Sequence, residues 1–234
     1  MTVAALVLAI TIALLTVHNL GIERLPAALY VPTCLPTTAG LVALAGWGAV
    51  GPDEIGLSSA GAGAGSAAGA AVAVLVVVAG LLPVTRPLFA DRRMAAVGRV
   101  GVAYRVLVRI PLGTVVLEEV AFRGVLPALV GQLVAPWWAV AGSCVLFGLW
   151  HVVPTVATLR TNHLPARPCV LGAVVVATGL VGAGFWWLRQ VTGGLAAPAL
   201  VHLAASGTAT FMGARANTFR DGADSRSRLD TAAT

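Results

Sequence analysis

Long uncharged apolar runs constrain the fold of this chain more than any other feature of its sequence. Residues 3–17, 67–82 and 169–188 contain no Asp, Glu, Lys or Arg. A helix needs about 20 apolar residues to cross about 30 Å of hydrocarbon. Only 10% of all residues are charged, whereas a soluble domain has roughly 25%. These features predict an all-α, polytopic bundle of transmembrane helices.

The apolar pattern predicts about seven membrane spans in one domain that covers residues 1–214. The expected spans are residues 3–20, 27–50, 62–84, 107–131, 136–158, 169–189 and 194–214. Gly61, Gly65 and Gly69 recur every four residues at the start of the third span and predict a face for close helix packing. Residues 215–234 are polar and charged, which predicts a disordered tail.

The distribution of arginine predicts how the bundle is oriented. The chain has no lysine, and its 15 basic residues give a net charge of +6. If seven spans alternate, all arginines except Arg123 and Arg189 lie on one side, which the positive-inside rule makes cytoplasmic. We therefore expect a multi-pass protein of the cell membrane with a cytoplasmic C-terminus. No zinc-finger spacing or basic stripe with interleaved aromatic residues occurs, so we expect no nucleic-acid partner.

Three charged residues interrupt the fourth expected span, in the stretch LEEVAFRG. Glu119 and Arg123 are four residues apart on a helix and can form an ion pair, which reduces the cost of both charges in the membrane. This structural role does not explain Glu118, which is rotated by about 100° from Glu119 and has Phe122 at the i+4 position. Glu118 is therefore a candidate general base.

Two histidines also lie within expected spans, His151 in FGLWH and His202 in HLAAS. A lone histidine in a span more often forms a hydrogen bond between two helices than catalyses a reaction. Here the two histidines and Glu118 lie at comparable depths in the membrane, which favours a shared site. At about 1.5 Å per residue, Glu118, His151 and His202 lie roughly 16, 10 and 18 Å from the cytoplasmic ends of their spans. Together they could activate water and stabilise an oxyanion, or bind zinc with one open position. His18 and His163 lie near span ends, and we expect them to be structural.

Three motifs, in this order and on separate spans, resemble those of a known family. EEVAFRG, FGLWH and GGLAAPALVHLAAS are similar to the EExxxR, FxxxH and HxxxN motifs of the CPBP family of intramembrane proteases, which includes CAAX proteases and bacteriocin-processing enzymes. The resemblance covers roughly residues 105–210. Phe147 is the first residue of the FxxxH match, and Ser206 stands where the family usually has asparagine.

The resemblance implies an active site inside the bundle. Glu118 would activate the attacking water together with His151, Glu119 would hold Arg123, and His202 would help to form the oxyanion hole. The implied enzyme is an endopeptidase that hydrolyses a peptide bond of a membrane-associated peptide or protein, at a site open to the cytoplasmic leaflet.

Alternatives remain on two points: whether the enzyme needs a metal, and whether the protein is catalytically active. The family is commonly labelled metalloprotease, but similarity to its type II CAAX prenyl endopeptidases favours a mechanism without a cofactor. If a metal takes part, we expect zinc bound by Glu118, His151 and His202. Ser206 also leaves open a catalytically weakened scaffold or immunity protein. A small proton-coupled transporter is less favoured because the sequence has no repeated halves.

The composition also indicates the kind of genome that encodes the chain. All basic residues are arginine, and Ala, Gly and Val are abundant, which indicates a GC-rich, bacterial genome.

Overall fold

The computed structural model describes residues 2–95 and 97–232, with side chains for residues 2–94 and 97–216. These ranges contain helices and no strand. Four elements deviate from α-helical hydrogen bonding: η1 and η2 are 3₁₀-helical, and η3 and η4 are π-helical. The elements are α1 (Val3–Ile22), η1 (Ala27–Leu29), α2 (Tyr30–Trp47), α3 (Ala62–Leu81), η2 (Arg86–Phe89), α4 (Arg92–Ala95), α5 (Arg99–Tyr104), η3 (Arg105–Val115), α6 (Val116–Glu119), η4 (Val120–Val125), α7 (Leu126–Gly131), α8 (Pro136–Trp150), α9 (Val152–Thr161), α10 (Pro168–Thr192) and α11 (Ala196–Ala232).

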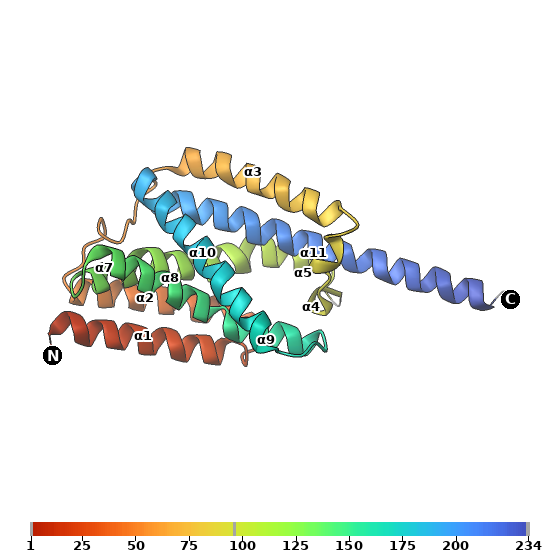
Figure 1. Cartoon of the computed structure of the whole chain (residues 1–234), viewed down its shortest axis with the longest axis horizontal. Coiled ribbons are helices and arrows are strands. Elements are labelled where there is room, and N and C mark those ends of the chain that lie inside the picture. Colours follow the sequence, from red (N-terminus) through yellow and green to blue (C-terminus); the bar gives the residue numbers. More distant parts are fainter. Residues whose placement is uncertain (1, 96, 233–234) are drawn as a thin grey trace.

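Six helical stretches are long and apolar enough to cross a membrane. They are Val3–Ile22, Ala27–Trp47, Ala62–Leu81, Arg99–Gly131, Pro136–Thr161 and Pro168–Thr192. Helix α11 lies along α3 and takes the place of the seventh expected span (Figure 1). The prediction of an all-α polytopic bundle is therefore confirmed. Helix α11 also continues past residue 214 to Ala232, and the disorder expected for residues 215–234 stays a prediction.

The connections between spans alternate between the two ends of the bundle. Residues 48–61, 132–135 and 193–195 lie toward the end at which α1 begins (Figure 1). Residues 23–26, 82–95 and 162–167 lie toward the opposite end, in the direction in which α11 leaves the bundle. The arginine-rich connections thus share one end, as seven alternating spans require. That this end is cytoplasmic stays a prediction.

Helix α3 packs against α11 through glycine. A Cβ atom at Gly65 would lie 2.5 Å from Cα of Ala197, and one at Gly69 would lie 3.1 Å from the carbonyl oxygen of Leu200. A side chain at residue 65 would collide with the backbone of α11, and one at residue 69 would be tightly crowded against it. Gly61 has a different role, because it caps α3 with a φ of +76° and faces Thr192 of α10. Two of the three glycines in the expected stripe therefore form the α3–α11 contact and position the helix that carries His202.

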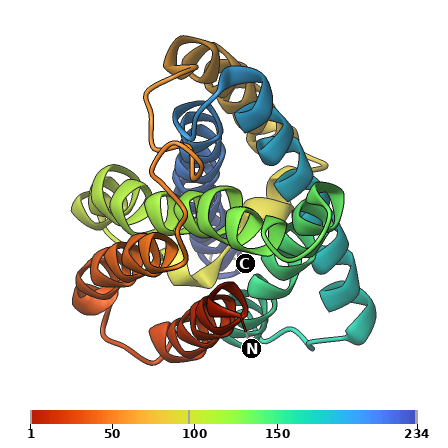
Figure 2. The ribbon, with the colours of Figure 1, turned by 90° about the vertical axis from the view of Figure 1, so that its left-hand side faces the viewer.

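The span Arg99–Gly131 crosses the middle of the bundle (Figure 2) and carries much of its core. It contains Pro111, which has no N–H to donate, within the π-helical segment η3. A second π-helical segment, η4, follows directly after Glu119. The two glutamates thus lie in the single short α-helical segment, α6, between two wider turns. Such π-helical insertions occur frequently at functional sites.

Candidate active site

Glu118 lies buried at the centre of the bundle, and its two carboxylate oxygens have different surroundings. The indole Nε1 of Trp150 donates a hydrogen bond of 2.9 Å to Oε1. Within the described residues, Oε2 forms no hydrogen bond. It faces Nε2 of His202 at 3.7 Å, which is longer than a hydrogen bond but within reach of an ion pair when His202 is protonated.

His202 of α11 lies between the two adjacent glutamates. Its Nδ1 is 2.8 Å from Oε1 of Glu119, while its Nε2 points toward Glu118. Consecutive helical side chains are rotated by about 100° from each other. The two carboxylates therefore approach the imidazole from different directions, and each faces a different ring nitrogen. The ring of Phe185 lies 5.3 Å from that of His202 and covers it on the α10 side. Of the two candidate catalytic histidines, His202 is therefore the one in direct contact with the glutamate pair.

The ion pair expected from helix spacing is present. Nη1 of Arg123 is 3.3 Å from Oε1 of Glu119, and the two side chains are 1% and 2% exposed. The guanidinium also lies over two aromatic rings, at 3.9 Å from the centroid of Phe147 and 5.0 Å from that of Phe185. Cation–π attraction adds to the ion pair when the cation is desolvated. Phe147 therefore contacts Arg123 within the site.

His151 lies at the C-terminal end of α8, apart from the glutamates. Its Nδ1 is 2.8 Å from the carbonyl oxygen of Phe147, and its ring packs against the ring of Phe147 at 4.6 Å. Among the described contacts, no hydrogen bond or ion pair joins His151 to Glu118 or His202. Ser206 is half-buried on α11, one turn beyond His202.

The residues proposed as zinc ligands do not form a metal-binding group in this arrangement. No three His, Cys, Asp or Glu side chains in the described ranges are placed to hold one metal ion. Glu118 and His202 approach each other, but Nδ1 of His151 faces the Phe147 carbonyl and not the other two side chains. As placed, these three residues do not hold one metal ion together. That the protein needs no metal stays a prediction, and we derive no step through a metal.

Trp150 and Phe185 belong to the site and were not predicted from the sequence. Trp150 could have been noted because it directly precedes His151 in the FGLWH motif. Phe185 has no such signal, since it is one of many apolar residues in its span. His18, which we expected to be structural, stacks on Trp150 with a centroid distance of 6.1 Å and an interplanar angle of 8°.

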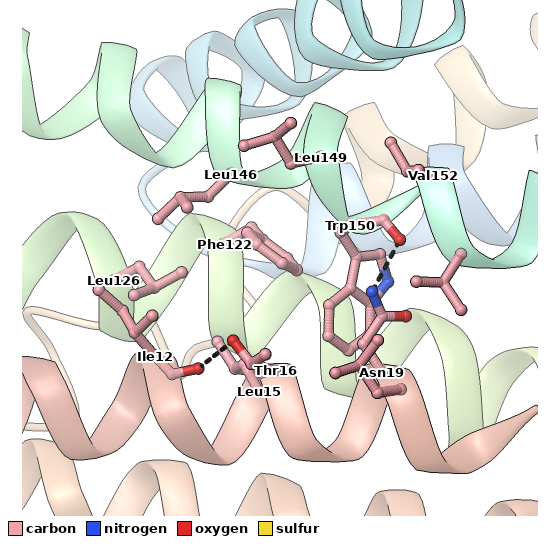
Figure 3. A pocket seen from close by; sticks show the side chains of 12 residues that line it. Ile12, Leu15, Thr16, Asn19, Phe122, Leu126, Leu146, Leu149, Trp150 and Val152 are labelled. Carbon is pink, nitrogen blue, oxygen red and sulfur yellow. Dashed lines mark hydrogen bonds between the residues drawn. The ribbon is translucent and has the colours of Figure 1, made fainter. Parts of the chain in front are cut away.

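An apolar cavity of about 400 Å³ lies beside the site, between α1 and α8 (Figure 3). Phe122 and Trp150 form part of its wall, and their rings meet edge to face at 5.4 Å. The indole of Trp150 thus borders the cavity and also contacts Glu118. The remaining lining residues are Ile12, Leu15, Thr16, Asn19, Leu20, Leu126, Leu146, Leu149, Val152 and Val153.

A bundle of membrane-length helices with two carboxylates, a guanidinium and an imidazole at its centre defines a polytopic membrane protein with an intramembrane polar site. The family model described as type II CAAX prenyl endopeptidase Rce1-like matches residues 101–208. Residues 101–208 therefore match the Rce1-like family, in agreement with the family that the three motifs predict. Neither the curated proteins nor the solved structures gave a match to the chain.

Proposed function

We propose that this protein is an intramembrane endopeptidase that hydrolyses a peptide bond of a membrane-associated peptide or protein. The observation that carries the proposal is the placement of Glu118 within the Rce1-like domain. One of its buried oxygens is held by Trp150, and the other is 3.7 Å from Nε2 of His202 without a hydrogen bond from the described residues. A carboxylate with one free oxygen in a nearly dry site is suited to accept a proton from water.

In the proposed reaction, water binds beside Oε2 of Glu118 and Nε2 of His202. Oε2 of Glu118 takes a proton from this water as its oxygen bonds to the scissile carbonyl carbon. The tetrahedral intermediate then collapses, the C–N bond breaks, and Glu118 returns the proton to the leaving amine. The products are a carboxylic acid and an amine, and the enzyme is regenerated.

His202 has the geometry of an oxyanion donor in its protonated form. An imidazolium donates through both nitrogens. Nδ1–H then donates to Glu119, which orients the ring, and Nε2–H is free to donate to the negative charge that develops on the substrate oxygen. Arg123 contacts the same oxygen of Glu119, Oε1, and so helps to fix the carboxylate that orients His202.

His151 assists Glu118 in this proposal, as the family resemblance implies. If its Nδ1–H donates to the Phe147 carbonyl, its Nε2 is an acceptor that can hold the second hydrogen of the attacking water. This role requires the ring to lie nearer to Glu118 when substrate is bound. Catalytic hydrogen bonds are often long in free enzymes and shorten in the complex.

The test is cleavage of a tagged peptide library by purified protein in lipid nanodiscs. Glu118→Gln should abolish cleavage while leaving the melting temperature near that of the wild type, because the amide oxygen still accepts from Trp150. Glu23→Gln is the matched control, since Glu23 is exposed at the end of α1. Cleavage that persists in Glu118→Gln would refute the role of Glu118. A wild-type protein that cleaves nothing would favour a scaffold over an enzyme.

A further inference from the structure

Trp150 is held by α1 while it donates to Glu118. Nδ2 of Asn19 donates a hydrogen bond of 3.1 Å to the backbone carbonyl of Trp150. The neighbouring residue, His18, stacks its ring on the indole, nearly parallel to it. On a third side, Phe122 packs edge to face against the same ring (Figure 3). The carbonyl of Trp150 and its ring are thus both held by neighbouring residues, and its N–H is directed at Oε1 of Glu118.

His18 is itself held by α2. Its Nδ1 is 3.0 Å from Oγ1 of Thr37, and its Nε2 is 3.7 Å from Sγ of Cys34. The Thr37 hydroxyl already donates its hydrogen to the carbonyl of Thr33, at 2.8 Å. It can therefore only accept from His18, which places a proton on Nδ1. A continuous set of contacts leads from α2 through His18 to Trp150 and Glu118.

We infer that Trp150 is a positioning residue for Glu118, and that the α1–α2 hairpin acts on the site through it. This inference rests on the proposed function. The hairpin lies outside residues 101–208, the part of the chain that the family model matches. Its contacts with the site, made by His18 and Asn19, therefore come from a part of the chain that the family model does not cover.

The physical basis is the rotational freedom of a carboxylate. The terminal torsion of Glu is broad and roughly two-fold, so an unrestrained carboxylate samples many orientations. A charge-assisted hydrogen bond to Oε1 fixes that torsion and leaves Oε2 as the oxygen that faces His202. Small errors in the position of a catalytic base reduce the rate strongly. A phenylalanine at position 150 could make the ring contacts but could not donate to Glu118.

The first measurement compares Trp150→Phe with Trp187→Phe, a control at an exposed tryptophan of α10. For Trp150→Phe we expect kcat to fall roughly 10- to 100-fold, the effect of one hydrogen bond to a charged group. KM should stay within about twofold, because Trp150 acts on the base. A loss of melting temperature with unchanged kcat would show that Trp150 only packs, and would overturn the inference.

A double-mutant cycle tests the contribution of α1. Asn19→Leu should lower kcat in the wild-type background, because Trp150 is then less firmly held. In the Trp150→Phe background the same substitution should leave kcat unchanged, since no indole N–H remains to be directed. If the two effects multiplied independently, α1 would not act through Trp150.

A third measurement does not depend on turnover. Dicyclohexylcarbodiimide modifies carboxyl groups within membranes, and fragment masses distinguish Glu118 from Glu119. Trp150→Phe should speed modification of Glu118, because the carboxyl group is no longer held, while Glu119 stays unchanged. This outcome supports the positioning role even if the wild type cleaves no peptide, in which case only the proposed function fails. Equal labelling in the wild type and Trp150→Phe would overturn the positioning role in either case.

Discussion

Replacing Glu119 by glutamine should destabilise the protein more than any other conservative change in the site. Oε1 of Glu119 is 3.3 Å from Nη1 of Arg123 and 2.8 Å from Nδ1 of His202. Glutamine keeps an oxygen that accepts from His202 but removes the negative charge opposite Arg123, whose side chain is 1% exposed. Removing one partner of a buried ion pair costs about 3–5 kcal/mol.

We expect the lower end of that range, about 3 kcal/mol, because one hydrogen bond survives and two aromatic rings still face the guanidinium. For a chain of this size, that loss lowers the melting temperature by about 6–12 °C. The assay is thermal unfolding of purified protein, followed by intrinsic fluorescence in one detergent. Glu23→Gln serves as the control for loss of an exposed carboxylate and should leave the melting temperature unchanged.

A second substitution separates a stranded charge from lost packing. Glu119→Gln combined with Arg123→Met removes the unpaired cation and keeps much of its volume. If the stranded charge is the cause, the double variant should recover at least about half of the lost stability. A double variant less stable than Glu119→Gln, or a single variant that melts like the wild type, would refute this account of Glu119.

Four further predictions concern activity, metal, topology and pH. Ser206→Asn should raise turnover of a cleavable peptide, because the longer amide N–H reaches further from α11 and one oxyanion donor is worth roughly 10²–10³ in rate; an unchanged rate would make the position irrelevant. Strong chelators should not change activity, and stoichiometric zinc that is lost in His151→Ala would contradict this. A C-terminal reporter should be active only on the cytoplasmic side, and activity outside would reverse the orientation. Burial raises the pKa of Asp91, but hydrogen bonds from Arg93 and Asn162 together with the charge of Arg93 outweigh it, so the pKa is lowered. Asp91 therefore stabilises the fold above about pH 4 and loses this effect as pH falls through its lowered pKa. Asp91→Asn should lower the melting temperature at pH 7, and this loss should become smaller as the pH falls below about 4.

The spans and the Glu119–Arg123 pair could be predicted because each depends on local rules. A bilayer of fixed thickness imposes span length, so apolar runs mark the helices directly. The i,i+4 spacing places two side chains on one face whatever the helix packs against. Both predictions need only one helix at a time.

The partners of Glu118 could not be predicted in the same way. Counting residues gives the depth of a side chain in the membrane but not the rotation of its helix. Glu118, His151 and His202 were expected to meet because their depths are similar. In the structure, Trp150 of α8 contacts Glu118, and the Nδ1 atom of His151 faces the Phe147 carbonyl. The π-helical turns on both sides of α6 also change which residues share a face.

The charges of the four polar side chains in the site explain why these side chains cluster inside the bundle. With both glutamates ionised, Glu118 and Glu119 contribute two negative charges and Arg123 one positive charge, and a protonated His202 then makes the cluster neutral. A neutral cluster is the least costly arrangement in a membrane interior. His202 lies close to both carboxylates, so its positive charge can balance the negative charge of either Glu118 or Glu119. Proton transfer to Glu118 during the proposed reaction changes this balance by one unit, and His202 is the group placed to respond to it.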